Sequence, residues 1–380
     1  MKKVFPVILA LVIMLSLVGC GGNSSTPPPT APPPATPAAT TTAPEASTPE
    51  ATPEAKEVPE TNVVRWNSGT SGNVLLTIAE ELGYFEEVGL TIQDVPATSN
   101  ADSMTMLATG QVDVVSNSGT SNPLQQIAAG VDLTIFGGHM VNGCMPIIAL
   151  KGTEWNGPQD LVGKKFACNP SYFALTGAVM DLGYEAPLDA LEWIVYTNYN
   201  DALAAVIRGE VDYALLGTGQ NFMVESMDEV DVMCYQSDVM SNYSCCRMES
   251  STEFVKNNPV TIKLILKVLI RAQSYYEANM DEAVALHAKK IGTEEDYVAA
   301  YMLNDHYLVN VDPLLNSVVR AWDILDATGF LNENAKNLDI LDHVNTELYE
   351  AALKECVEEY GGEAPAFYAE LQAFFEENNR

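Results

Sequence analysis

The sequence predicts an α/β protein of two doubly wound lobes, followed by a helical C-terminal extension. Strand and helix signals alternate from residue 62 to residue 136, the alternation starts again near Lys151, and strand signals stop after Cys246. Strands that alternate with helices favour a parallel sheet with helices on both faces. With 380 residues, of which 47% are hydrophobic, the chain is long enough to bury two such cores.

The elements of the first lobe are predicted from short β-prone runs and from apolar residues at helical spacing, each helix being closed by glycine. The expected strands are 62–66, 90–95, 112–116 and 133–136, and the expected helices are 75–85, 101–109 and 123–129. Pro123 suits the first turn of its helix, where its missing N–H costs nothing. The order of these elements predicts a parallel sheet.

The second lobe repeats the pattern on a smaller scale. Its expected strands are 165–168, 191–196 and 211–216, and its expected helices are 171–182 and 201–207. Amphipathic helices then run from residue 258 almost to Arg380. Two internal repeats support the division into similar lobes: GQVD at 110–113 matches GEVD at 209–212, and NSGTS occurs at both 67–71 and 117–121.

The N-terminal region is expected to lie outside the folded lobes. Residues 1–20 resemble a lipoprotein signal peptide, in which Lys2 and Lys3 precede a short apolar run and the sequence LVGC ends in Cys20, the residue that would be lipidated. Residues 21–60 contain eleven Pro, eight Thr and eight Ala and no aromatic residue, which is typical of a disordered, extended linker. The folded part is therefore expected to begin near residue 61.

Charge and cysteine spacing exclude several classes of function. The chain has 51 acidic and 19 basic residues, a net charge of −32, so it would repel a nucleic acid. The six cysteines after Cys20 form no CxxC pair and have no nearby histidines, so neither a metal site nor a redox motif is expected. The sequence contains no P-loop and no GxGxxG, so no nucleotide cofactor is expected. No Ser-His-Asp order, metal-ligand spacing or carboxylate pair can be picked out, so no catalytic residue is expected.

The candidate site lies in four loops that follow predicted strands, because ligands of open α/β sheets bind at the carboxyl ends of strands. The loops are rich in hydroxyls, amides and glycine, which donate hydrogen bonds to a small polar ligand without carrying charge. The candidate ligand-binding residues are Trp66, Asn67, Ser68, Gly69, Thr70, Asn117, Ser118, Gly119, Thr120, Asn169, Ser171, Tyr172, Gly217, Thr218, Gly219 and Arg247. Capping of the following helices is the alternative role of each hydroxyl or amide.

Four segments resemble a known family. They are IAEELGYFEEVGL at 78–90, LATGQVDV at 107–114, DLVGKKF at 160–166 and FVKNNP at 254–259. Together they resemble solute-binding proteins of the ABC importers for nitrate, sulfonates, taurine and thiamine precursors. The resemblance implies a type II periplasmic-binding-protein fold, with lobe 1 formed by residues 61–150 and 241–380, lobe 2 by 151–240, and crossovers near Leu150 and Met240.

The same resemblance implies a function and a place in the cell. The protein is expected to be a monomeric, lipid-anchored lipoprotein on the extracytoplasmic face of the cell membrane, where it closes on a small solute and delivers it to an ABC permease. It is not expected to be an enzyme. The alternative class is the thiamine-pyrimidine synthase of the same fold, which is marked by a histidine and a cysteine-rich run. Here the run is only the pair Cys245 and Cys246, and the four histidines, His139, His287, His306 and His343, are scattered.

The chemistry of the solute stays open at this stage. An anion such as a sulfonate or nitrate could be held by helix N-termini and by Arg65 or Arg247. A planar heterocycle, such as a thiamine pyrimidine or a riboflavin precursor, could instead stack on aromatic side chains near the loops. The aromatic candidates are Trp66, Tyr172, Phe173, Tyr196 and Tyr199.

Overall fold

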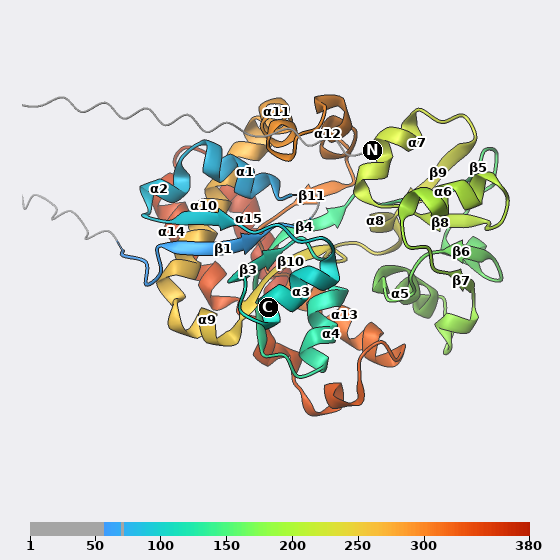
Figure 1. Ribbon diagram of the computed structural model, residues 1–380, viewed down its shortest axis with the longest axis horizontal. Helices are drawn as coiled ribbons and strands as arrows, with labels where there is room; N and C mark the ends of the chain where they lie inside the picture. Colours follow the sequence, from blue (N-terminus) through green and yellow to red (C-terminus); the bar gives the residue numbers. More distant parts are fainter. Residues whose placement is uncertain (1–56, 70–71) are drawn as a thin grey trace, which may run out of the picture. The chain divides into compact units, whose positions relative to one another are not determined.

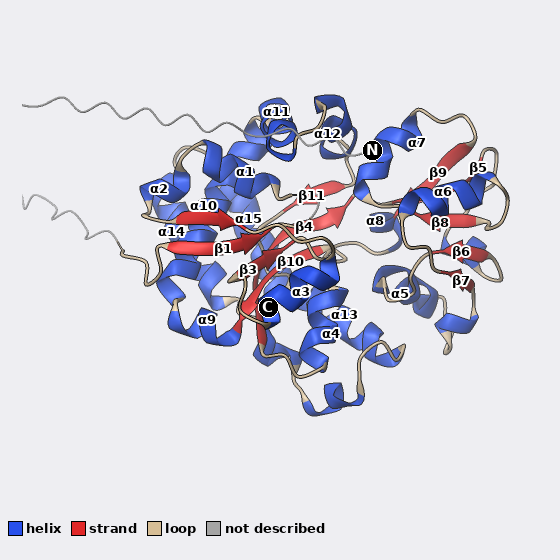
Figure 2. Cartoon of the chain, in the orientation of Figure 1, coloured by secondary structure: helices blue, strands red, loops and turns tan. Residues whose placement is uncertain are grey.

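The computed structural model describes residues 57–69 and 72–380. The predicted signal peptide with Cys20, residues 21–56 of the predicted linker, and Thr70 lie outside the described residues. In the described part of the chain, two β-sheets are each flanked by helices (Figures 1 and 2). No helix in this part is both long and apolar enough to cross a bilayer. The predicted α/β architecture of two lobes is confirmed.

The sheet of the first lobe has six strands in the order β11-β4-β10-β3-β1-β2. Its strands are β1 (Val63–Asn67), β2 (Thr91–Asp94), β3 (Val114–Ser116), β4 (Leu133–Gly143), β10 (Cys246–Ser251) and β11 (Tyr307–Val309). Strand β1 runs parallel to β2 and β3, whereas β10 runs antiparallel to β3 and β4, and β11 antiparallel to β4. The prediction of a wholly parallel sheet, and of no strands after Cys246, is therefore wrong, because β10 is inserted between β3 and β4.

The sheet of the second lobe has five strands in the order β7-β6-β8-β5-β9. They are β5 (Pro146–Leu150), β6 (Lys165–Ala167), β7 (Glu192–Ile194), β8 (Tyr213–Leu215) and β9 (Val230–Tyr235). Strands β7, β6 and β8 run parallel, while β5 runs antiparallel to both β8 and β9. Because β5 already belongs to this sheet, the first crossover lies at residues 144–145, earlier than the expected position near Leu150.

Several of the helices between the strands begin at polar caps. The helices up to the second crossover are α1 (Val74–Glu81), α2 (Tyr84–Glu87), α3 (Asn100–Ala108), α4 (Ser121–Ala128), α5 (Phe173–Asp181), α6 (Tyr199–Ile207), α7 (Asn221–Glu225) and α8 (Gln236–Val239). The side chain of Asn73 accepts hydrogen bonds from two backbone N–H groups of α1, and Ser99 caps α3 in the same way. These caps start the helices just after the strand ends and so shape the loops between the two.

The C-terminal extension contacts both lobes. Its helices are α9 (Thr252–Asn257), α10 (Pro259–Ala278), α11 (Met280–Ile291), α12 (Glu295–Met302), α13 (Leu315–Ala327), α14 (Glu347–Tyr360) and α15 (Pro365–Asn379). Helix α10 packs against α1 and α14 in the first lobe, while α12 contacts α7 and α13 contacts α5 in the second (Figure 1). The extension therefore reaches the region between the two sheets as well as covering the first lobe.

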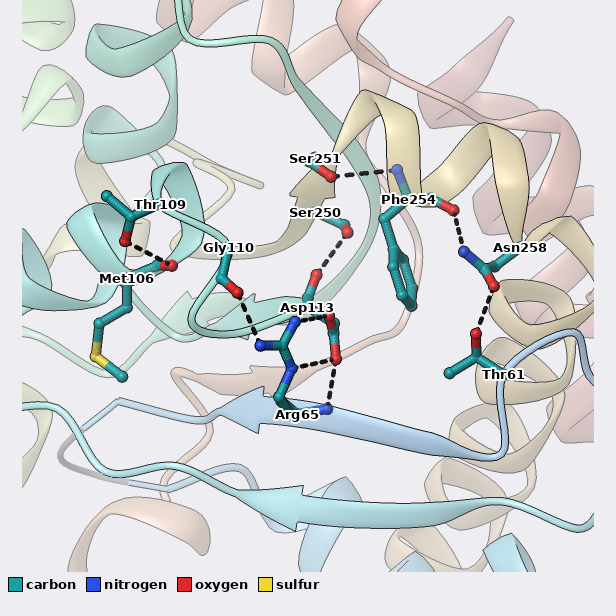
Figure 3. Close-up of polar contacts among 10 residues, drawn as sticks. All are labelled: Thr61, Arg65, Met106, Thr109, Gly110, Asp113, Ser250, Ser251, Phe254 and Asn258. Atoms are coloured by element: carbon teal, nitrogen blue, oxygen red, sulfur yellow. Dashed lines mark hydrogen bonds and ion pairs between the residues drawn. The ribbon is translucent and has the colours of Figure 1, made fainter.

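The folded region begins slightly before the predicted boundary at residue 60. The carboxylate of Glu60 accepts hydrogen bonds from the backbone N–H groups of Val260 and Thr261, at the start of α10. The hydroxyl of Thr61 donates to Asn258 at 2.7 Å (Figure 3). Because these contacts join the segment to α10, Glu60 belongs to the folded lobe rather than to the linker.

The repeated GxVD turns make equivalent contacts in the two lobes. Asp113 accepts a hydrogen bond from the backbone N–H of Arg65 at 2.8 Å, and Asp212 accepts one from the backbone N–H of Lys165 at 2.9 Å. In the first lobe only, the Arg65 guanidinium adds a two-point contact, with Nε to Oδ2 at 3.0 Å and Nη2 to Oδ1 at 2.5 Å (Figure 3). Arg65 also donates to the carbonyl oxygen of Gly110, so its guanidinium is committed to this turn.

Replacing Asp113 with asparagine should lower the free energy of unfolding by about 1 kcal/mol, because the amide keeps the backbone contact but loses the ionic one. The Arg65 side chain is 40% exposed, which limits the loss. Urea unfolding would measure it. Asp212→Asn is the matched control, since that turn has no arginine on its carboxylate and should lose much less. Equal losses in the two variants would contradict the assigned role of the Arg65 contact.

Candidate functional site

A cavity of about 560 Å³ is lined by loops and helices of both lobes. This volume lies within the range of small-molecule sites. The first lobe contributes the loop 117–122 after β3, residues of β4 and the segment 243–246 before and at the start of β10. The second lobe contributes the start of α5, Tyr199 and the loop 217–220, and the C-terminal extension contributes residues 291–307. The cavity therefore lies at the carboxyl ends of β3, β6 and β8, as expected for a sheet of this kind.

Half of the sequence-predicted site residues line this cavity. Those that do are Asn117, Ser118, Gly119, Thr120, Tyr172, Gly217, Thr218 and Gly219. The residues predicted for the site that do not line it are Trp66, Asn67, Ser68, Gly69, Asn169, Ser171 and Arg247, and Thr70 lies outside the described residues. Asn169 and Tyr196 line a second hollow of about 420 Å³, which adjoins the cavity and shares Asn100, Tyr172, Tyr199 and Gln220 with it.

The first NSGTS loop is used for structure. Trp66 is fully buried, and its Nε1 donates to the Ser116 hydroxyl at 3.0 Å. Asn67 is also buried, donates to the carbonyl oxygen of Val95 at 2.7 Å and accepts from Ser103 at 2.8 Å. With both of its polar groups bonded, Asn67 joins the end of β1 to Val95 and to α3, and it does not cap the following helix, whose N-cap is Asn73.

Arg247 is the second correction to the predicted site. Its side chain is only 1% exposed, and its guanidinium donates to the backbone carbonyl oxygens of Met140 and Asp312. Burial lowers the pKa of Arg247 to about 10, so the group remains cationic at neutral pH. Its two Nη groups are directed at strand β4 and the segment before α13, whereas Nε has no partner among the described residues, so Arg247 holds these elements together rather than lining the cavity.

Aromatic side chains form much of the cavity wall. Tyr172 and Phe173 lie at the start of α5, and the hydroxyl oxygens of Tyr172 and Tyr199 are 3.1 Å apart. Four further tyrosines come from the first lobe and the extension: Tyr243, Tyr297, Tyr301 and Tyr307. Tyr301 packs edge-on against both Tyr297 and Tyr307, with ring centroids 6.1 and 5.5 Å apart. Sequence reasoning missed these four, because nothing in the local sequence links residues 297–307 to loops almost 200 positions earlier.

Two buried polar side chains in the wall have unused hydrogen-bonding atoms. Neither ring nitrogen of His139 has a hydrogen-bond partner among the described residues, and the same holds for Oε1 of Gln236. Both side chains are at most 3% exposed, and both line the cavity. Burial, with the nearby His287 and Arg247, lowers the pKa of His139 to about 3, so its ring is neutral at physiological pH. A buried polar atom without a partner is costly, and a ligand in the cavity could supply the missing bonds.

The described lining carries no lysine or arginine. Its hydroxyl groups are partly committed within the protein: Ser118 donates to the buried carboxylate of Glu249 at 2.8 Å, and Thr120 donates to the backbone carbonyl oxygen of Ser244. The cavity thus offers tyrosine rings and hydroxyls, a neutral imidazole and an amide oxygen. Among the described residues, no group of three or more His, Cys, Asp or Glu side chains could hold a metal ion.

The model of the family described as NMT1/THI5 like matches residues 73–283, more than half of the chain. The chain belongs to the NMT1/THI5 like family. The matched region runs from the cap of α1 through the second lobe and into α11, so it includes most of the cavity wall. The part beyond it contains Thr293, Tyr297, Tyr301 and Tyr307, so this wall of the cavity lies outside the family match.

Solved structures share the fold of this NMT1/THI5 like chain. The periplasmic aliphatic sulphonate binding protein SsuA from Escherichia coli aligns with a TM-score of 0.64 and 19% identity, over 75% of this chain and 92% of that chain. The periplasmic nitrate-binding protein NrtA from Synechocystis PCC 6803 aligns with a TM-score of 0.62 and 14% identity, over 79% and 90% of the two chains. At these identities the likeness establishes the periplasmic-binding-protein fold.

A curated relative is similar in sequence. It is the 4-amino-5-hydroxymethyl-2-methylpyrimidine phosphate synthase of Schizosaccharomyces pombe, 24% identical over 233 residues, which are 55% of this chain and 63% of the relative. The match therefore spans less than two thirds of the relative's length.

Proposed function

We propose that this protein is the extracytoplasmic solute-binding component of an ABC importer, and that it captures a small, neutral, planar solute between its two lobes. The observation that carries the proposal is the cavity of about 560 Å³ lined by both lobes, with six tyrosines, a neutral histidine and a glutamine oxygen in its wall. A wall that spans both lobes allows a solute to stabilise their closed arrangement.

The chemistry of the wall favours a planar heterocycle over a sulfonate or nitrate. An anion in a cavity of this kind needs a cation or several free donors, whereas Arg247 and Arg65 are both bonded elsewhere. Aromatic rings stack on planar ligands, and the histidine and glutamine can pair with ring nitrogens and an exocyclic amine. The synthase relative is named for an aminopyrimidine phosphate, whose planar ring, without the phosphate, belongs to this class of solute.

Thermal shift measurements with the purified chain would test the proposal. The panel is aminopyrimidines and riboflavin on one side and taurine, alkane sulfonates and nitrate on the other. A solute at 100 times its dissociation constant adds about 2.7 kcal/mol to the stability of the folded state. We expect the shift with a planar heterocycle. A shift with sulfonates or nitrate only would overturn the assignment of the solute while leaving the binding role intact.

Replacing Gln236 with methionine should weaken binding of that solute about fivefold, because a neutral hydrogen bond contributes about 1 kcal/mol. The stability of the solute-free protein should be unchanged or higher, since Oε1 has no partner there. Calorimetric titration would measure the affinity. Gln126→Met makes the same change on α4, outside the cavity wall, and should leave the affinity unaltered. Equal affinity of Gln236→Met and the unmutated chain would remove Gln236 from the site.

Delivery and anchoring complete the proposal. Lipidation of Cys20 would tether the protein to the outer face of the cell membrane, and the linker would hold the lobes away from it. A lipid on the N-terminal fragment and co-purification with a permease would be the direct measurements.

Capture is also distinguishable from synthesis of the kind named for the fungal relative: a binding protein releases its solute with unchanged mass, whereas a synthase releases a different compound.

A further inference from the structure

The cavity wall contains two adjacent cysteines whose thiols face each other. Cys245 and Cys246 both line the cavity, and their Sγ atoms lie 3.6 Å apart. Neighbouring side chains of a regular strand point to opposite faces of the sheet, which would separate the two sulfurs. The chain departs from that pattern here, because Ser244 has a φ of 53° and the register of β10 shifts between Cys246 and Arg247.

We propose that Cys245 and Cys246 are a vicinal dithiol that a small organic disulfide oxidises, by thiol–disulfide exchange, to a disulfide bond in the wall of the cavity. The proposal does not depend on which solute the cavity binds. It requires only that one thiol can be reached from the cavity and that the second lies within reach of the first. The structure meets both requirements.

The surroundings of the pair assign a different role to each sulfur. Cys245 is half-buried, whereas Cys246 is 5% exposed. The contact with Cys246, together with Tyr243 and the charge of Arg247, lowers the pKa of the Cys245 thiol, while the same contact and burial raise the pKa of Cys246. Because the thiolate is the nucleophile, Cys245 is the attacking residue and Cys246 the resolving one.

The exchange proceeds in two balanced steps. The Cys245 thiolate attacks one sulfur of the organic disulfide, forming a mixed disulfide and releasing one small thiolate. Cys246 then loses its proton and attacks Cys245 Sγ, which forms the bond between the two residues and releases the second small thiolate. Two protein thiols are oxidised, one organic disulfide is reduced to two thiols, and the two cysteine protons end on these thiols. The protein sulfurs must move from 3.6 Å to about 2.05 Å apart, so the wall shifts on oxidation.

Mass spectrometry of the full chain would test the proposal. The reduced protein is incubated with oxidised glutathione, its remaining thiols are alkylated, and the chain is cleaved after Tyr243 to separate the pair from Cys234. We expect the fragment with Cys245 and Cys246 to have lost two hydrogen atoms and to carry no alkyl group. Alkylation of both cysteines, a lasting glutathione adduct in the unmutated chain, or a bond from Cys245 to another cysteine would each overturn the proposal.

Two variants provide the controls. Cys246→Ser should stop at the glutathione adduct on Cys245, because it lacks the resolving thiol. Cys234→Ser removes a half-buried cysteine of β9 outside the cavity wall and should oxidise like the unmutated chain. Phenylarsine oxide joins two neighbouring thiols with loss of water. It should protect Cys245 and Cys246 from alkylation in Cys234→Ser, whereas Cys245 of Cys246→Ser should still be alkylated. Equal protection in the two variants would show that the thiols are not a pair.

Discussion

Replacing Arg247 with methionine is expected to lower the free energy of unfolding by about 3–5 kcal/mol, the cost of removing one partner from a buried charged network. The variant keeps an unbranched apolar side chain but deletes the guanidinium. Backbone carbonyl oxygens of Met140 and Asp312 then lose their donors in the interior. The Asp312 carboxylate, which is fully buried, also loses the cation that favours its charged form. Urea unfolding at neutral pH would measure the change.

The control for this variant is Arg208→Met. Arg208 forms an exposed ion pair with Glu210 at 2.7 Å, and such pairs contribute about 0–1 kcal/mol. A large loss at Arg247 with a negligible one at Arg208 would establish the buried contacts as the cause. The opposite pattern for Arg247, with stability retained and affinity for a sulfonate lost, would restore the anion-binding role that the sequence suggested.

Arg247 also helps to explain why strand β10 was not predicted from the sequence. The strand reads CRMESS and is central in its sheet, yet it contains an arginine and a glutamate, both buried. Buried strands are normally recognised by apolar runs, and here two ionisable side chains interrupt the run. The partners of Arg247, near residues 140 and 312, are far away in sequence. By contrast, β1 and β3 have apolar runs and glycine-closed helices beside them, and these were predicted within a few residues.

The candidate site was predictable to a similar extent. The loop at 117–120 and the loop at 217–219 follow strands that local patterns reveal, and both line the cavity. His139 lies inside the long strand β4, where a single polar residue gives no signal until its neighbours are known. Tyr297 and Tyr301 reach the cavity because α12 packs against the second lobe, and Tyr307 reaches it because β11 pairs with β4. Such packing between distant segments cannot be read from hydrophobic periodicity.

Replacing Glu249 with glutamine is expected to remove a pH dependence of stability between pH 6.5 and 8. Glu249 is fully buried, Ser118 donates to its Oε1, and Oε2 has no hydrogen-bond partner among the described residues. Burial raises the pKa of its carboxyl from 4.5 to about 8, although the Ser118 hydrogen bond and Arg247 act in the opposite direction. Over this range the folded chain holds a proton that the unfolded chain has released. Stability therefore falls as the pH rises, by up to about 1.4 kcal/mol per pH unit.

The window from pH 6.5 to 8 separates Glu249 from the other buried groups of its cluster. The pKa of His139 is lowered to about 3, so His139 contributes stability that is lost only as the pH falls below its ordinary value of 6.5. Burial raises the pKa of Asp312 to about 6, so its effect is largely complete at the lower limit of the window. Thermal unfolding of Glu249→Gln should thus give a flat profile where the unmutated chain declines. The control is Glu253→Gln, at an exposed position on α9, which should show the same fall of stability with pH as the unmutated chain. If the fall persisted in Glu249→Gln, another group would be its cause.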